Sequence, residues 1–151
     1  MTTVVEYRMN KATEAEIAEH LRESDITFVP PLSGRVEIND YARKIASLAM
    51  CFEAWSAGAL IGLVATYCNN LETRIAHITS VSVLSEWAGK GIAARLMSQC
   101  IEHVKTSGIQ QISLEVARDN APAFKLYEKY GFIAGEAKTS LICMDLHLKS
   151  G

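Results

Sequence analysis

The sequence contains no apolar run that approaches the ~20 residues needed to span a bilayer as a helix. At its N-terminus it also lacks the basic segment, apolar core and small-residue cleavage site of a secretory signal peptide. These absences argue against a membrane protein and against export. We therefore expect a cytoplasmic protein with no membrane partner.

Cysteine is sparse, and the four residues are scattered through apolar segments without a C-x-x-C pair or a nearby group of histidines. This pattern is typical of free thiols in a reducing compartment, not of a zinc site or a disulfide framework. We therefore expect buried free thiols and no bound metal. The cysteines are Cys51, Cys68, Cys100 and Cys143.

Neither sign of charge is in large excess, because 15 lysines and arginines face 17 aspartates and glutamates. The formal net charge is −2. Runs of Lys and Arg, which mark nucleic-acid-binding surfaces, are also missing. We therefore expect no nucleic-acid partner.

Complete nucleotide-binding motifs are missing too, since no Gly-Lys-Ser/Thr follows the glycine-rich turn and G-x-G-x-x-G is unfinished. The chain does contain a β-branched strand at 78–83, the turn Ala88-Gly89-Lys90-Gly91 and an apolar-striped helix after it. The first N–H groups of a helix lack intrahelical partners and lie at its positive end, so they attract phosphate. Glycine lets the backbone approach such an anion closely. Taken alone, the turn also fits an ordinary strand-to-helix connection.

A second stretch, from 114 to 132, changes how that turn is interpreted. Together the two stretches resemble the GCN5-related N-acetyltransferase (GNAT) family, and the likeness extends loosely over nearly the whole chain. The turn is similar to the family's motif A, Q/R-x-x-G-x-G/A, with Ala88 in place of the usual Arg or Gln. The second stretch is similar to its motif B through Asn120, Ala123, Leu126-Tyr127 and Gly131-Phe132.

The order of the expected elements predicts the fold class. Antiparallel strands come first, strand–helix–strand crossovers follow and a hairpin closes the chain, which predicts one mixed α/β domain over 1–151 with helices on both sheet faces. The resemblance implies the GNAT fold, a mostly antiparallel mixed sheet of six to seven strands whose fourth and fifth strands splay apart. Hydrophobic periodicity predicts strands at 4–9, 50–55, 59–68, 74–83, 111–117, 132–138 and 141–148, and helices at 13–23, 39–49, 91–105 and 121–130.

The same resemblance implies acetyl-CoA as cosubstrate. Its pantetheine arm would enter the gap between the splayed strands and pair with the backbone of 81–83. The amides of 89–94 would hold the pyrophosphate, and Ala88 would weaken this contact. Asn120 would cap its helix and touch the cofactor. The implied cofactor-binding residues are Val81, Ser82, Val83, Gly89, Lys90, Gly91, Ile92, Ala93, Ala94, Asn120 and Tyr127.

Acetyl transfer to an amine needs a neutral amine and a proton donor for the departing thiolate. Tyr127 is the best donor, because a phenol is protonated at neutral pH. Its spacing from Ala123, Leu126 and Tyr130 also fits a core aromatic on the inner face of a helix. The resemblance implies that this tyrosine lies close to the cofactor sulfur, which favours the general acid.

The general base has three candidates. Glu115 lies on a strand opposite to its apolar neighbours, and burial of both sheet faces there would raise its pKa. It resembles the glutamate base of ribosomal-protein N-terminal acetyltransferases, while an ion pair with a nearby Lys or Arg, or a carboxylate at the rim of the site, is the open alternative. His77 titrates in a suitable range, but its side of the strand is that of Val81, which would turn it toward a helix. A water chain is the third candidate.

The acceptor site is expected in the least regular region, residues 24–41, together with the last hairpin. Apolar residues there would form a wall, and Arg35 could bind a carboxylate or phosphate of the acceptor. A closing loop that packs under the sheet is the open alternative. The expected acceptor contacts are Phe28, Pro31 and Arg35.

The sequence thus predicts an N-acetyltransferase in which the amine of a small molecule or peptide attacks acetyl-CoA directly in a ternary complex. Two alternatives stay open. One is a non-catalytic acetyl-CoA-binding regulatory domain, and the other is an O-acyltransferase or a transferase of longer acyl chains. The resemblance also allows a homodimer, since many family members pair.

Overall fold

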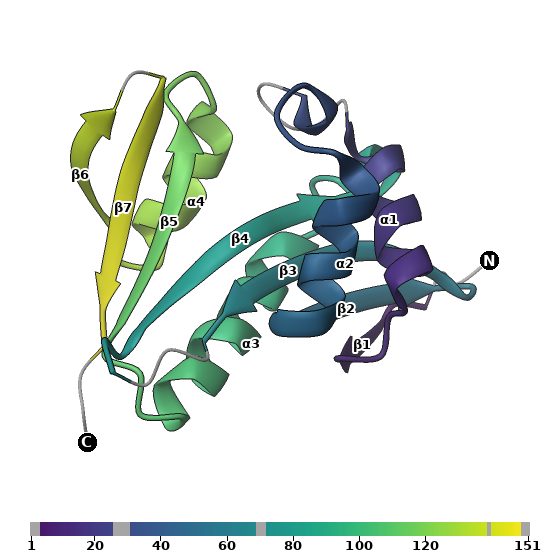
Figure 1. The fold of residues 1–151 in the computed structure, drawn as a ribbon, viewed down its shortest axis with the longest axis horizontal. Coiled ribbons are helices and arrows are strands. Elements are labelled where there is room, and N and C mark those ends of the chain that lie inside the picture. Colours follow the sequence, from purple (N-terminus) through teal and green to yellow (C-terminus); the bar gives the residue numbers. More distant parts are fainter. Residues whose placement is uncertain (1–3, 26–30, 69–71, 139, 149–151) are drawn as a thin grey trace.

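The computed structural model describes residues 4–25, 31–68, 72–138 and 140–148. They form a seven-stranded sheet in the order β1-β2-β3-β4-β5-β7-β6 (Figure 1). The predicted mixed α/β fold is confirmed, and the predicted elements differ from the observed ones by only a residue or two at their ends. The strands are β1 (Glu6–Met9), β2 (Met50–Ser56), β3 (Ala59–Tyr67), β4 (Ile75–Val83), β5 (Gln111–Ala117), β6 (Ile133–Lys138) and β7 (Leu141–His147), and the helices are α1 (Glu14–Glu23), α2 (Ile38–Leu48), α3 (Ile92–Thr106) and α4 (Ala121–Lys129).

Two hydrophobic clusters lie on opposite faces of the sheet. On one face, Leu96 and Met97 of α3 and Tyr127 of α4 pack with strand residues. On the other face, α1 and α2 cover β2 and β3, and Ile17 and Ile45 are fully buried there. Within the described ranges, no helix is both long enough and apolar enough to cross a bilayer.

Side chains cap the N-termini of three of the four α-helices in the described ranges. Thr13 and Glu16 form the capping box that the sequence indicates at α1. Glu37 caps α2, and Asn120 caps α4 as predicted. By contrast, α3 begins after Gly91, which is in the left-handed conformation, and has no side-chain cap.

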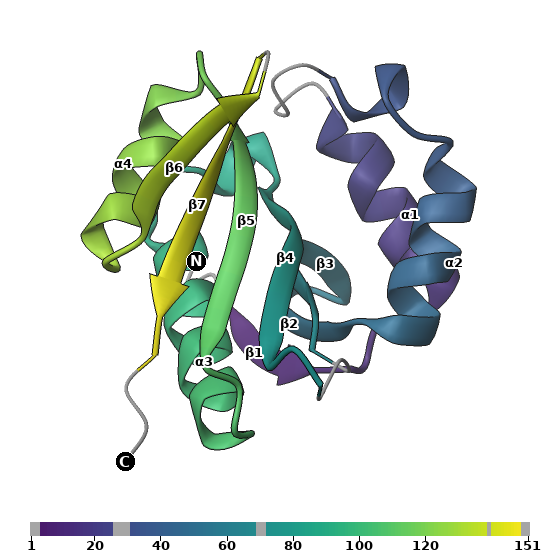
Figure 2. The same cartoon turned by 60° about the vertical axis from the view of Figure 1, so that its left-hand side comes forward.

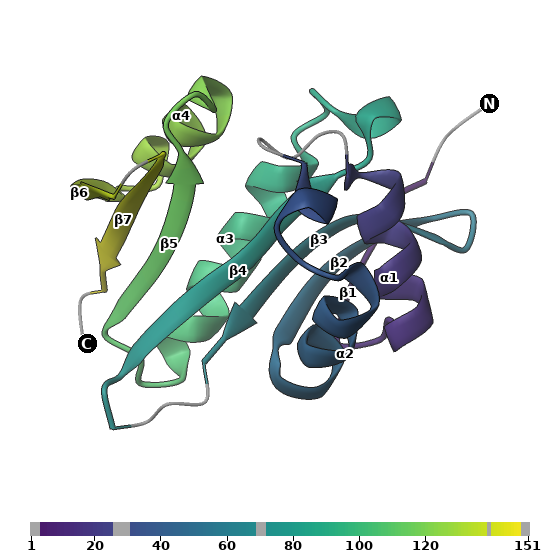
Figure 3. The same cartoon turned by 45° about the horizontal axis from the view of Figure 1, so that its top comes forward.

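β4 and β5 run parallel and pair at one end only. Residues 75–77 of β4 pair with 111–113 of β5, whereas β5 pairs with β7 along all of 111–117. Beyond residue 77 the two parallel strands diverge, and the sheet opens into a wedge (Figures 2 and 3). The expected splay is therefore present, and the edge of β4 that faces the wedge has no strand partner there among the described residues.

A β-bulge at Thr79 changes which side chains of β4 face each layer. Consecutive residues of β3 pair with Ile78 and with Ser80, so Thr79 is an extra residue in the strand. Tyr41 of α2 donates its hydroxyl proton to the Thr79 carbonyl at 2.6 Å. Ile78 before the bulge and Val81 after it both pack in the α3 cluster, so the alternation of the strand shifts by one residue.

His20 connects α1 to the sheet from a buried position. Its Nδ1 donates to the Leu60 carbonyl at 2.9 Å, and its Nε2 accepts from the Ser82 hydroxyl at 2.8 Å. The tautomer follows because a carbonyl can only accept a hydrogen bond. Burial lowers the pKa of His20 to about 4, so the ring is neutral at physiological pH.

The stability of the fold should depend on pH through His20. The unfolded chain takes up a proton near pH 6.5 and the folded chain only near pH 4, so the free energy of unfolding falls as the pH drops between these values. The expected loss is about 3 kcal/mol at pH 4, from about 1.4 kcal/mol per pH unit. Urea unfolding between pH 7 and pH 4 measures it. His20→Gln should flatten this part of the curve, and parallel curves for the two proteins would contradict the assignment.

The four cysteines carry free thiols, as predicted. Cys51 and Cys100 are buried as expected, whereas Cys68 and Cys143 are only half-buried. Burial raises the pKa of Cys51 to about 12 and that of Cys100 to about 11, so both are protonated and poor nucleophiles at neutral pH. Among the described residues, no group of three or more His, Cys, Asp or Glu side chains could hold a metal ion.

Candidate active site

A cavity of about 490 Å³ lies in the wedge between β4 and β5. Its walls come from residues 77–83 of β4, the end of β5, the first turn of α3, the first two turns of α4, the start of β7, and the segment that leads into α2 together with Tyr41 of α2 (Figure 2). The cavity gathers many residues that the sequence singles out: Arg35, His77, Val81, Ser82, Val83, Ala93, Glu115, Asn120 and Tyr127.

The glycine-rich turn leads into α3, whose first turn reaches the cavity. Gly89 and Gly91 have φ of +76° and +80°, in the left-handed region that favours glycine, and open space lies where a Cβ would be. The first N–H groups of α3 have neither a side-chain cap nor an intrahelical partner. Among the residues predicted here, Ala93 lines the cavity, whereas Gly89, Lys90, Gly91, Ile92 and Ala94 do not.

Gly62 of β3 lets α3 lie close to the sheet. A Cβ at this position would lie 2.9 Å from Cγ2 of Ile92 and 3.2 Å from Cδ1 of Leu96. The first residue of α3 therefore packs where no larger strand side chain fits. An isolated glycine within an apolar strand is the sequence signal for such a close approach, and the family motifs do not include it.

Tyr127 lies between the hydrophobic core and the cavity. Its side chain is 7% exposed and packs at 6.0 Å from the ring of Phe132, centroid to centroid. It also lines the cavity, and its hydroxyl has no hydrogen-bond partner among the described residues. Burial raises its pKa to about 12. The structure thus combines both sequence interpretations, a core aromatic and a protonated phenol at the cavity.

Glu115 lines the cavity from β5, but its surroundings differ from the expectation. Its side chain points away from the buried Ile112, Leu114 and Val116, as predicted. The side chain is exposed, however, so the expected burial of both faces of β5 is wrong. This face of β5 is uncovered because α1 and α2 pack on β2 and β3. No ion pair within the described ranges involves Glu115.

His77 is half-buried and lines the cavity. Its expected position on the side of Val81 is wrong, because the bulge at Thr79 reverses the alternation between the two residues. His77 lies on the face opposite to Ala76 and Ile78, which pack in the α3 cluster. Its place in the cavity keeps it among the candidate bases.

The segment before α2 forms one side of the cavity. Leu32 is 3% exposed and packs with α1 and α2, yet it also lines the cavity. The segment is therefore a packed loop that also forms part of the cavity wall. Arg35 and Tyr41 line the cavity as well. Pro31 is exposed and does not line it, and Phe28 lies outside the described residues.

Two serines of β4 add polar groups that the motifs do not indicate. The hydroxyl of Ser82 is bonded to His20. Ser80 is 4% exposed and lines the cavity, and its Oγ has no hydrogen-bond partner among the described residues. The sequence pattern that could have indicated these two serines is the alternation of serine and valine at 80–83.

Residues 15–132 match the acetyltransferase (GNAT) family. The chain belongs to the GNAT family. The fold of this GNAT domain extends the likeness beyond the matched residues. It resembles the PaiA N-acetyltransferase of Thermoplasma acidophilum, solved in complex with coenzyme A, with a TM-score of 0.74 and 21% identity over 95% of this chain and 99% of that one.

Curated relatives of the GNAT chain match it over shorter segments. The N-alpha-acetyltransferase MAK3 of Arabidopsis thaliana is 31% identical over 85 residues, which cover 56% of this chain and 45% of the relative. The L-amino acid N-acetyltransferase AaaT of Escherichia coli is 41% identical over 69 residues, which cover 43% of each chain. The GNAT chain thus spans less than half the length of these relatives.

Proposed function

We propose that the protein is an acetyl-CoA-dependent N-acetyltransferase. One observation carries the proposal: the unpaired edge of β4 and the uncapped N-terminus of α3 meet at one cavity that also contains a buried tyrosine. The strand edge offers backbone groups to an extended chain that carries amides, and the helix offers N–H groups to phosphate. GNAT membership and the coenzyme A named for the PaiA neighbour support this function.

The residues present fit the proposed cosubstrate. The backbone of 81–83 would pair with the pantetheine arm along the open edge of β4. The amides from Gly89 to Ala94 would hold the pyrophosphate, and the two left-handed glycines keep Cβ atoms away from it. Ala88 contributes no side-chain donor, so these amides would carry the contact. Asn120 would touch the cosubstrate from the first turn of α4, whose cap it also forms.

Gly91→Ala should weaken coenzyme A binding about tenfold, because a Cβ at φ +80° costs roughly 1–2 kcal/mol and shifts the amides at the start of α3. Isothermal titration with coenzyme A measures the affinity. Gly108→Ala is the matched control, since Gly108 has φ +83° and lies just after the other end of the same helix. The control should lose similar stability and keep its affinity, and an equal loss of affinity in both variants would contradict a role for the turn.

The proposed reaction forms one bond and breaks one. The amine nitrogen attacks the acetyl carbonyl carbon, and the C–S bond of the thioester breaks. Tyr127 donates a hydrogen bond to the sulfur as negative charge develops there, and then its proton. Burial keeps the phenol protonated until that moment, because its pKa is about 12. The amine gives up a proton to the base, and Tyr127 regains one from the solvent.

Glu115 is the proposed base, with His77 and water as alternatives. If Glu115 removes the proton, Glu115→Gln can use only amines that arrive neutral, so its turnover number should fall about tenfold for each pH unit below the acceptor's pKa. Turnover numbers across pH 6–9 measure this. Glu128→Gln, an exposed position outside the cavity lining, is the control. An unaltered pH profile in Glu115→Gln would return Glu115 to a structural role.

Release of free CoA thiol against a panel of acceptors tests the function as a whole. The panel contains peptide N-termini, lysine side chains, polyamines, amino sugars and amino acids. A rate well above background hydrolysis for one class supports the proposal. Acetyl-CoA binding without transfer to any acceptor would favour a regulatory domain, and preferential use of hydroxyl acceptors or longer acyl chains would favour the other alternative.

The proposal also includes the compartment, the acceptor and the oligomeric state of the enzyme. We place it in the cytoplasm, because the four unpaired thiols fit a reducing compartment. Its acceptor is a small-molecule or peptide amine, and a homodimer is compatible with the fold. Sedimentation equilibrium of the full chain distinguishes a monomer from a dimer.

A further inference from the structure

We infer that the acceptor is a free amino acid, or another small amine that carries a carboxylate beside its amino group. The inference rests on the proposed function and concerns the acceptor end of the same cavity. Its basis is the distribution of charge along the cavity wall and the size of the cavity.

Among the described residues, the cavity is lined by one permanently positive side chain and one acidic side chain. Arg35 comes from the segment before α2, on the α1–α2 side of the wedge, and Glu115 comes from β5 on the other side (Figure 2). A zwitterion has matching charges, a carboxylate for Arg35 and an ammonium for Glu115. A polyamine would bring like charge to Arg35, which disfavours it.

The backbone that carries Arg35 is held in place. Leu32 is buried against α1 and α2, and the N–H of Arg35 donates to the Leu32 carbonyl at 2.9 Å. Asp25 accepts two hydrogen bonds from Ser33, one from the N–H and one from the hydroxyl, both at 2.7 Å. Arg35 is exposed at the end of this fixed turn. Because the turn is already ordered, binding of a ligand loses less conformational entropy of the backbone.

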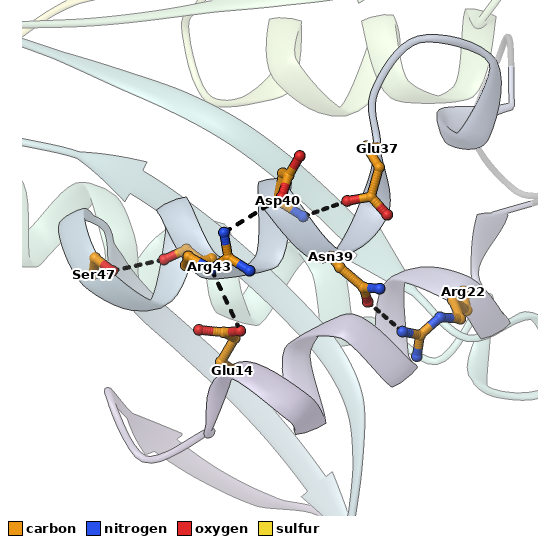
Figure 4. A network of polar contacts seen from close by, with 7 residues as sticks. All are labelled: Glu14, Arg22, Glu37, Asn39, Asp40, Arg43 and Ser47. Atoms are coloured by element: carbon orange, nitrogen blue, oxygen red, sulfur yellow. Dashed lines mark hydrogen bonds and ion pairs between the residues drawn. The ribbon is translucent and has the colours of Figure 1, made fainter.

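The carboxylates that follow Arg35 in the sequence are engaged elsewhere (Figure 4). Glu37 accepts the N–H of Asp40 at 2.6 Å and so caps α2. Asp40 pairs with Arg43 at 3.4 Å, and Arg43 also approaches Glu14 at 3.8 Å. No ion pair within the described ranges involves Arg35, so its charge is available to a ligand.

Ser80 adds a buried polar group to the cavity wall. The Tyr41 hydroxyl donates to the Thr79 carbonyl at 2.6 Å. Burial raises the pKa of Tyr41, and the Ser80 hydroxyl lies close enough to offset part of that rise. The wall beside Arg35 is therefore polar as well as charged, which suits a polar acceptor.

The size of the cavity points to the same class of acceptor. About 490 Å³ must admit the acetylated end of the cosubstrate as well as the acceptor. The space that remains suits a small molecule. A peptide N-terminus, by contrast, has an amide where an amino acid has its carboxylate, and it would leave Arg35 without a partner.

The test measures acetyl transfer by the full chain at saturating acetyl-CoA. It compares amino acids with the corresponding amino-acid amides as acceptors. The amide keeps the side chain and the amine but loses the negative charge. We expect kcat/KM to be about 10- to 100-fold higher for the acid, the range of one charge-assisted contact. Arg35→Gln should raise KM for the acid by a similar factor and leave its kcat and the KM of the amide unchanged. Arg35→Lys should restore part of the preference.

Arg118→Gln is the matched control, because it removes the same charge at an exposed position outside the cavity lining. The inference would be overturned if kcat/KM were equal for the acid and the amide, or if Arg35→Gln lowered it equally for both. The proposed N-acetyl transfer would stand in either case. A preference for peptides or polyamines would likewise overturn only the inference. Absence of transfer to every acceptor, with acetyl-CoA binding intact, would overturn the proposed function and the inference with it.

Discussion

Tyr127→Phe should lower the turnover number about 100-fold and change the affinity for acetyl-CoA by no more than about twofold. The size of the effect is that of one general acid, which typically contributes 10²- to 10⁴-fold to a rate. The affinity should persist because the ring, which is 7% exposed and packs near Phe132, remains in place. The hydroxyl can be removed at little structural cost, since it has no partner among the described residues.

Single-turnover rates and coenzyme A titrations measure the two quantities separately. Tyr7→Phe is the control, because it removes a phenol from β1, away from the cavity lining. A turnover number within about threefold of the natural protein would exclude Tyr127 from the chemistry and leave it as a core aromatic. A matching loss of coenzyme A affinity would instead indicate that the hydroxyl acts in binding the cosubstrate.

Glu53→Ala should lower the free energy of unfolding by about 4 kcal/mol. The side chain of Glu53 is fully buried in β2, and its carboxylate accepts the N–H groups of Lys11 and Ala12 at 3.0 Å and Nε1 of Trp55 at 3.0 Å. Removing the carboxylate leaves three donors without a partner, each at a cost of about 1–3 kcal/mol. The connection between β1 and α1 would lose its attachment to the sheet.

Urea unfolding at pH 7 measures the effect, which corresponds to a fall in Tm of about 10 °C for a chain of this size. Glu19→Ala, at an exposed position of α1, should change the stability by less than about 0.5 kcal/mol. The stability of Glu53→Gln should lie between those of Glu53→Ala and Glu19→Ala. The amide oxygen can still accept a hydrogen bond, but the amide NH₂ group faces N–H donors and finds no acceptor. A loss below about 1 kcal/mol in Glu53→Ala would show that the carboxylate does not hold this connection.

The order of the elements could be predicted because local signals decide it. The capping pair Thr13 and Glu16, the turn at Gly58 and the apolar stripe of α3 each act within a few residues. The positions of Tyr127 and Asn120 at the cavity follow from the family resemblance, because spacing alone fits a core aromatic and a helix cap equally well.

Other features depend on pairing and packing between distant segments, and the sequence does not display them. The run Thr79-Ser80-Val81-Ser82-Val83 alternates regularly, yet the register with β3 makes Thr79 a bulge and moves His77 to the opposite face from the one expected. Glu115 is exposed because, in the described ranges, α1 and α2 cover β2 and β3 and not β5. The segment before α2 has no periodicity, so only its packing shows that Leu32 anchors Arg35.

The open wedge has a consequence for the lifetime of the protein. Among the described residues, β4 and β5 pair at three positions only, so beyond them the two halves of the domain are held together by side-chain packing and by the hydrogen bonds of Tyr130 with Ser98 and Ala94 of α3. A pantetheine arm in the wedge would bridge the halves and stabilise the folded chain by about 2.7 kcal/mol at 100 times its Kd. Proteases cleave locally opened chains, and such openings become rarer as the ligand binds. The open sheet would therefore make survival of the chain depend on the supply of its cosubstrate.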